Sequence, residues 1–61
     1  MDMYVCSCRV FEYLADDSYK AHTYDITRYI EAEDEYTAME KLIEWAQNIW
    51  PDADIDEITA V

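Results

Sequence analysis

The first third of the chain alternates between apolar and polar residues with the period of two that is typical of a β-strand. From Met3 to Leu14, apolar residues lie on both parities of this alternation. One parity holds Tyr4, Cys6, Cys8, Val10 and Leu14, and the other holds Val5, Phe11 and Tyr13. A strand with apolar residues on both faces is typical of a sheet interior. We therefore predict that this strand is central.

A second strand is predicted from Ala21 to Ala32, where apolar residues again share one parity. These residues are Tyr24, Ile26, Ile30 and Ala32. Arg28 lies on the same parity, so either its stem is buried while its charged head reaches water, or the strand has a bulge there. The residues between the strands, Ala15 to Ser18, include side chains that favour turns. They are predicted to form the tip of a hairpin.

A helix is predicted next, beginning after Asp34, a good N-cap residue, and continuing to about Trp50. Its apolar residues recur with helical spacing at Ala38, Leu42, Trp45, Ala46 and Ile49, which predicts one buried stripe. Pro51 cannot continue the helix. A short third strand follows from Ile55 to Val61, in which Ile55 and Ile58 differ in parity and indicate a twist or a bulge.

These elements predict one domain, residues 1–61, of the α+β class with the order β-β-α-β. If the third strand lies beside the first, the sheet is three-stranded and antiparallel, and the helix packs on one face. The other face then stays open. It would display Arg9, Phe11, Tyr13 and Tyr29, a mixture of aromatic and charged groups typical of contact surfaces. Ordinary strand propensity explains the same aromatics equally well.

Charge narrows the range of partners. Fifteen acidic and four basic residues give a formal net charge of −11, which repels nucleic acid and anionic membranes. We therefore expect a protein partner and no direct contact with nucleic acid or membrane. The carboxylates expected to gather along the helix and near the hairpin tip are Asp16, Asp17, Glu33, Glu35, Glu40, Glu44, Asp52 and Asp54.

Such a line of carboxylates has the charge needed to imitate DNA. A compact chain of this length has a diameter of roughly 27 Å. Duplex DNA carries about 16 charges over that distance, close to the 15 carboxylates here. The alternative interpretation is that the acidity only keeps the protein in solution.

Catalysis and cofactor binding find little support in the sequence. The chain contains no glycine, so it has neither of the glycine-rich loops that hold nucleotide phosphates. Cys6, Cys8 and His22 are three candidate zinc ligands without an obvious fourth, and two buried thiols are the expected outcome. We therefore expect a non-enzyme without metal or cofactor. The absence of a long apolar run or a secretion signal predicts a cytoplasmic protein.

From Tyr24 to Val61 the chain resembles the small RNA-polymerase inhibitors of podoviruses. The resemblance rests on Tyr24-Asp25-Ile26, the Ala32-Glu33 step, Ala38, the pair Glu44-Trp45, Pro51 and the final strand. It implies the β-β-α-β order and an inhibitor that blocks transcription initiation. That family carries arginines in its last strand for contact with the polymerase, whereas this chain has Asp56 and Glu57 there, so no such contact is carried over.

In its small size, acidity and lack of catalytic residues, the chain is also similar to phage anti-defence proteins. The sequence therefore predicts an inhibitor of a host protein with a basic nucleic-acid-binding surface, such as a CRISPR effector, an RNA polymerase, or a restriction or repair enzyme. The alternative is an adaptor or a self-assembling module, including a homodimer, that uses the open sheet face.

Overall fold

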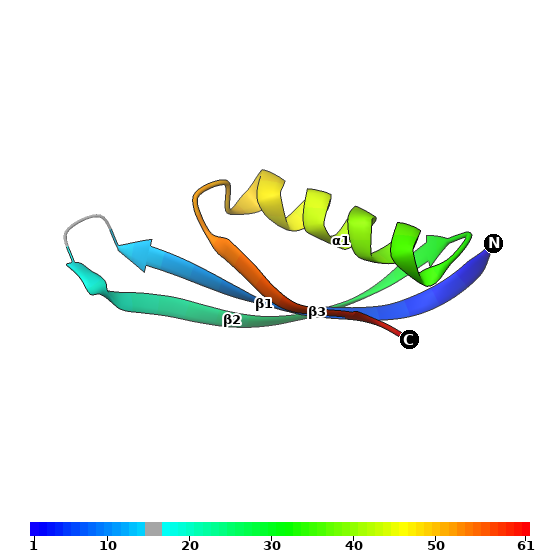
Figure 1. Cartoon of the computed structure of the whole chain (residues 1–61), viewed down its shortest axis with the longest axis horizontal. Helices are drawn as coiled ribbons and strands as arrows, with labels where there is room; N and C mark the ends of the chain where they lie inside the picture. The colour runs from blue at the N-terminus through cyan, green and yellow to red at the C-terminus, as the bar shows by residue number, and fades with distance from the viewer. Residues whose placement is uncertain (15–16) are drawn as a thin grey trace.

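The computed structural model describes residues 1–14 and 17–61, with side chains described for residues 1–13 and 22–61. Its elements follow the order β1 (Asp2–Leu14), β2 (Asp17–Ala32), α1 (Glu35–Ile49) and β3 (Asp54–Ala60). The strands form one sheet in the order β2-β1-β3, and both strand pairs are antiparallel. The predicted α+β fold with a central first strand is therefore confirmed, and α1 crosses one face of the sheet (Figure 1).

The molecule is longer than a compact chain of this size. Its radius of gyration is 12.6 Å and its extents are 44 × 16 × 13 Å. The expected radius was about 10.5 Å, so the predicted diameter of roughly 27 Å is wrong. The cause is the β1–β2 ribbon, which extends well past α1 (Figure 1). Of the predicted hairpin tip, Ala15 and Asp16 lie outside the described residues, and β2 begins at Asp17 instead of Ala21.

A small core lies between α1 and the covered face of the sheet. It consists of Cys6, Cys8, Val10 and Ala32 from the sheet and Ala38, Leu42 and Ala46 from the helix. Both cysteines are free and buried, as predicted. The alanines allow the helix to lie close to the sheet, and Leu42 is the largest fully buried side chain. Burial of Leu42 contributes roughly 2 kcal/mol to folding.

Ile49 was predicted to belong to the buried stripe, and this is wrong. Its side chain is 48% exposed. Two tryptophans occupy the space between the end of α1 and the sheet instead. The Trp50 ring stacks on Tyr24 at 5.5 Å between ring centroids and meets Trp45 edge-on at 5.9 Å. The last turn of α1 therefore packs through these rings, and Ile49 remains outside them.

Both ends of α1 follow from local chemistry. Asp34 is the N-cap, as predicted, and its carboxylate accepts a hydrogen bond of 2.8 Å from the backbone N–H of Thr37. This bond satisfies one of the backbone donors that a helix start leaves unpaired. The helix ends at Ile49, one residue before Trp50 and two before Pro51. Lys41 also ties α1 to the sheet, because its ammonium donates to the carbonyl of Glu31 at 2.7 Å.

Of the two alternatives for Arg28, the structure supports the one without a bulge. Arg28 pairs with Cys6 in an uninterrupted stretch of the β1–β2 register. Its guanidinium carbon lies 4.2 Å from the centroid of the Trp45 ring, in a cation–π arrangement. The charged head therefore covers an aromatic side chain of the helix while it stays in contact with water.

The predicted irregularity in the third strand is a bulge. Ser7 pairs with Thr59 and Arg9 pairs with Asp56, so Glu57 and Ile58 together oppose the single residue Cys8. Glu57 has a backbone φ of 51°, in the left-handed region that L-residues disfavour. Because of the extra residue, Ile58 also packs against the core, as Ile55 does.

Candidate functional site

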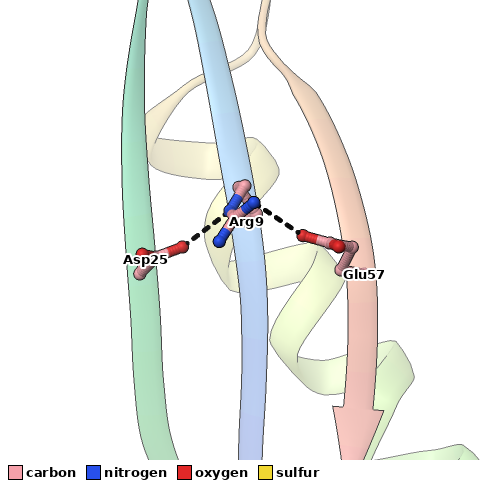
Figure 2. Close-up of polar contacts among 3 residues, drawn as sticks. All are labelled: Arg9, Asp25 and Glu57. Atoms are coloured by element: carbon pink, nitrogen blue, oxygen red, sulfur yellow. Dashed lines mark hydrogen bonds and ion pairs between the residues drawn. The ribbon is translucent and has the colours of Figure 1, made fainter.

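Arg9 is the centre of the open face of the sheet. Its Nε donates to Asp25 Oδ1 at 2.8 Å, and its Nη1 lies 3.2 Å from Glu57 Oε2. Figure 2 shows the arginine on the central strand, with one carboxylate from each neighbouring strand beside it. The hydrogen bond that Arg9 donates to Asp25 and the charges of Asp25 and Glu57 raise the pKa of Arg9. Arg9 therefore links the three strands, and two of its N–H groups are already engaged.

Hydroxyl groups occupy the next row of the open face. Ser7 Oγ and Thr59 Oγ1 are 2.6 Å apart across the β1–β3 pair, and either oxygen can be the donor. Thr27 pairs with Ser7 on the other side. A shallow hollow of about 260 Å³ lies beside this row and is also lined by Arg9, Asp25 and Glu57. Most of the polar side chains that line it already form a hydrogen bond or an ion pair within the sheet.

A second hollow lies between β1 and β3, on the other side of Arg9. It measures about 390 Å³ and is lined by Phe11, Tyr13, Asp54, Ile55 and Asp56. The Tyr13 hydroxyl donates to Asp54 Oδ2 at 3.2 Å, and this bond together with the Asp54 charge raises the pKa of Tyr13. Aromatic rings and carboxylates therefore meet in one concave site.

The opposite end of the open face is apolar. Val5 and Tyr29 pair directly across β1 and β2, and they are 40% and 72% exposed. Val61 extends this end, because Val5 and Val61 exchange two backbone hydrogen bonds of 3.0 Å. Met3, two residues before Val5 and on the same face of β1, also has an exposed side chain. Of the residues predicted for the open face, Tyr29 belongs to this apolar end, whereas Arg9, Phe11 and Tyr13 lie along the central strand.

The helix layer, meaning α1 and the segments just before and after it, carries a separate group of carboxylates. All of them are exposed: Glu33, Glu35, Glu40, Glu44 and Asp52. Within the described side chains, the ion pairs are those of Arg9, so no cation is paired with this group. Asp34 lies among them as the N-cap, and its bond from Thr37 lowers its pKa. The helix layer is therefore a strongly anionic surface.

The predicted line of carboxylates is thus divided. Five of its members belong to the helix layer, whereas Asp54 lies on the open face with Tyr13. Asp16 lies outside the described residues, and Asp17 is described only as the first residue of β2. The bulge explains the position of Asp54. It shifts the register of β3 by one residue, so Asp54 pairs with Phe11 and lies on the open face.

Sequence reasoning missed three acidic residues of the open face, Asp25, Asp56 and Glu57. The parity of β2 was sufficient to find Asp25, since it is odd-numbered like Thr27 and Tyr29 and pairs with Arg9. Glu57 had no such signal. Its contact with Arg9 depends on the bulge, and parity alone does not locate the extra residue.

A metal site and a membrane-spanning helix are both absent from the described residues. Within residues 1–14 and 17–61, no group of three or more His, Cys, Asp or Glu side chains is arranged to hold a metal ion. The one helix of that part of the chain is neither long nor apolar enough to cross a membrane. Comparison with protein-family models, curated proteins and solved structures gave no match.

Proposed function

We propose that this protein is a small acidic inhibitor of the phage type, which binds a host protein on its basic nucleic-acid-binding surface. The observation that carries the proposal is the exposed, unpaired state of the helix-layer carboxylates. A basic channel built for phosphates would meet these charges without first breaking ion pairs within the inhibitor. Complementary charge of this kind accelerates association and selects the partner.

Most of the helix-layer charges do not stabilise the helix itself. Glu40 and Glu44 are one turn apart on α1, where like charges destabilise a helix by roughly 0.2–0.5 kcal/mol. The last turn of α1 contains no basic residue, and Asp52 follows its negative end. Only the acidic residues at the start of the helix, such as Glu35, are favourably placed for the helix dipole. Binding to a cationic partner would offset the remaining repulsion.

The length of the helix refines the comparison with nucleic acid. The 15 residues of α1 span about 22 Å, over which a DNA duplex carries about 13 phosphate charges and one of its strands about 7. The five carboxylates of the helix layer therefore match one strand more closely than two. This ratio supports a target that grips a single strand or one side of a duplex, as CRISPR effectors, RNA polymerases, and restriction and repair enzymes do.

The proposal is tested by capture from a nuclease-treated bacterial lysate with the immobilised protein. We expect it to retain nucleic-acid-binding proteins, and added DNA oligonucleotides to release them, with single strands at least as effective as duplexes. A double substitution, Glu40→Gln with Glu44→Gln, removes two charges from the helix layer and should strongly reduce capture.

The matched control is Asp25→Asn with Glu57→Gln, which removes the same charge from the open face. This variant should retain most of the captured protein, because its helix layer is intact. Capture that neither DNA nor the helix-layer substitutions reduce would contradict the proposal.

A second candidate function is favoured by the apolar end of the open face. Val5 and Tyr29 together present exposed apolar surface on a sheet face that none of the described elements covers. Such a surface would suit an adaptor or a homodimer. In that case Tyr29→Asp should abolish self-association in sedimentation equilibrium while Glu40→Gln leaves it unchanged. A monomeric wild-type protein would reject the homodimer.

A further inference from the structure

We propose that the hollow between β1 and β3 on the open face binds an arginine side chain of a partner protein. The site is formed by the rings of Phe11 and Tyr13 and the carboxylates of Asp54 and Asp56. It lies on the face opposite the helix layer, so it stands independently of the proposed competition with nucleic acid.

The hollow combines the two groups that recognise a guanidinium. Tyr13 is 52% exposed, and Phe11 beside it is half-buried, so both rings line the hollow from β1. Asp54 and Asp56 are exposed on β3 and line the same hollow. A guanidinium stacks on aromatic rings and donates to carboxylates in its own plane, and this mixed geometry suits it better than an ammonium.

The next row of the same face shows how this sheet holds a guanidinium. There Arg9 bonds a carboxylate on each side, Asp25 at 2.8 Å and Glu57 at 3.2 Å (Figure 2). Asp56 is the register partner of Arg9, but Glu57 makes the ion pair. Among the side chains that the structure describes, no cation reaches Asp54 or Asp56. The hollow therefore has two carboxylates that could bind a guanidinium, and no described arginine occupies it.

The size and shape of the hollow indicate a side chain as its occupant. A volume of about 390 Å³ lies at the lower end of ordinary ligand sites, and only five residues line it. A single arginine side chain occupies part of such a shallow site, while neighbouring residues of its own protein contact the rest of it and the surrounding sheet. A metal ion is a poor fit, because no metal-binding group was found in the described part of the chain.

The test is an NMR titration of the isotope-labelled full chain with the peptide acetyl-Gly-Arg-Gly-amide. The same peptide with citrulline in place of arginine is the neutral isostere. We expect the largest shift changes at Phe11, Tyr13, Asp54 and Asp56. The citrulline peptide should bind at least about fivefold more weakly, since it loses both the cation–π and the ionic contacts.

Variants separate this site from general charge attraction. Asp54→Asn with Asp56→Asn should abolish the localised shifts, whereas Glu40→Gln with Glu44→Gln removes equal charge and should leave them unchanged. Tyr13→Leu should weaken binding without changing the net charge. Each variant is checked for a folded spectrum first.

Three results would overturn the inference: equal binding of both peptides, shift changes centred on the helix layer, or no measurable binding. None of these results bears on competition with DNA. The two proposals can therefore fail separately.

Discussion

Glu57 forms an ion pair with Arg9 at 3.2 Å, although the residue aligned with Arg9 across the strand pair is Asp56. The bulge in β3 is responsible, because it adds Glu57 to the strand and gives it a left-handed backbone. Glu57 thus pairs with the arginine on the side opposite Asp25, and among the described side chains no cation pairs with Asp56, which lines the hollow. The bulge therefore shapes both the centre of the open face and the proposed arginine site.

The left-handed backbone at Glu57 predicts that Glu57→Gly stabilises the fold. Glycine adopts a positive φ without steric cost, and the exposed ion pair that is lost contributes little. We expect a gain of about 0.5–1 kcal/mol in the free energy of unfolding. Glu57→Val, a β-branched control, should lose about 1–2 kcal/mol instead. Urea denaturation measures both, and a valine variant as stable as the glycine variant would show that the bulge is absent in solution.

The N-cap hydrogen bond predicts that substitution of Asp34 destabilises the fold, and that the size of this loss depends on pH. Asp34→Ala removes the acceptor for the Thr37 N–H and should lower the melting temperature by about 4–8 °C at neutral pH. The hydrogen bond lowers the pKa of Asp34 below its ordinary value of 3.8. The folded state therefore binds the proton less tightly than the unfolded state, and the ionic stabilisation is complete above about pH 4. It is lost as the pH falls through the lowered pKa.

Calorimetric melting of the wild type and the alanine variant measures this difference. The gap between their melting temperatures should narrow as the pH falls below about 4. Asp34→Asn is the control, because asparagine also caps helices but does not titrate. A gap that stays constant from pH 7 to pH 2 would show that the carboxylate does not cap the helix.

The core predicts opposite outcomes at two apolar positions of α1. Leu42 is completely buried, so Leu42→Ala should cost about 3 kcal/mol, much of the stability of a chain this short. Ile49 is 48% exposed, and Ile49→Ala should cost less than about 1 kcal/mol. Leu42→Met conserves volume and keeps the measurement possible if the alanine variant unfolds. Similar losses at both positions in urea denaturation would contradict the structure.

Burial of the two thiols predicts that they are unreactive in the native state. Cys6 is completely buried and Cys8 nearly so, and burial raises the pKa of both thiols. Since only the thiolate reacts, Ellman's reagent at pH 8 should modify them at least about 100-fold more slowly than free cysteine. Addition of urea should restore the normal rate. Rapid reaction of either thiol in native buffer would show that the covered face is open.

Much of the fold was predictable because local chemistry and tertiary packing agree. Asp34 signals the helix start, and the mismatched parity of Ile55 and Ile58 signals the bulge. The prediction that Ile49 is buried was wrong because helical spacing does not show whether the bulky rings of Trp45 and Trp50 will fill the space beside it. The predicted diameter of the molecule was wrong for another reason. The compactness scaling assumes a rounded chain, whereas here a two-stranded ribbon extends past its helix.

The candidate surfaces were less predictable than the fold. Parity correctly placed Arg9, Phe11, Tyr13 and Tyr29 on the open face, because β1 and β2 pair without interruption from Asp2 to Tyr13. Asp54 was grouped with the helix carboxylates from its position in the sequence, and its contact with Tyr13 depends on the register that the bulge gives to β3. Which carboxylates share a surface is therefore decided by pairing across strands, which the sequence does not show.

The salt dependence of binding to a captured host protein tests the central claim most directly. The dissociation constant, measured by titration calorimetry over increasing salt, should rise steeply for the wild type. Glu40→Gln with Glu44→Gln should weaken binding at low salt and reduce this slope. An affinity that is unchanged between low and high salt, with the same slope in the variant, would contradict a binding role for the helix-layer carboxylates.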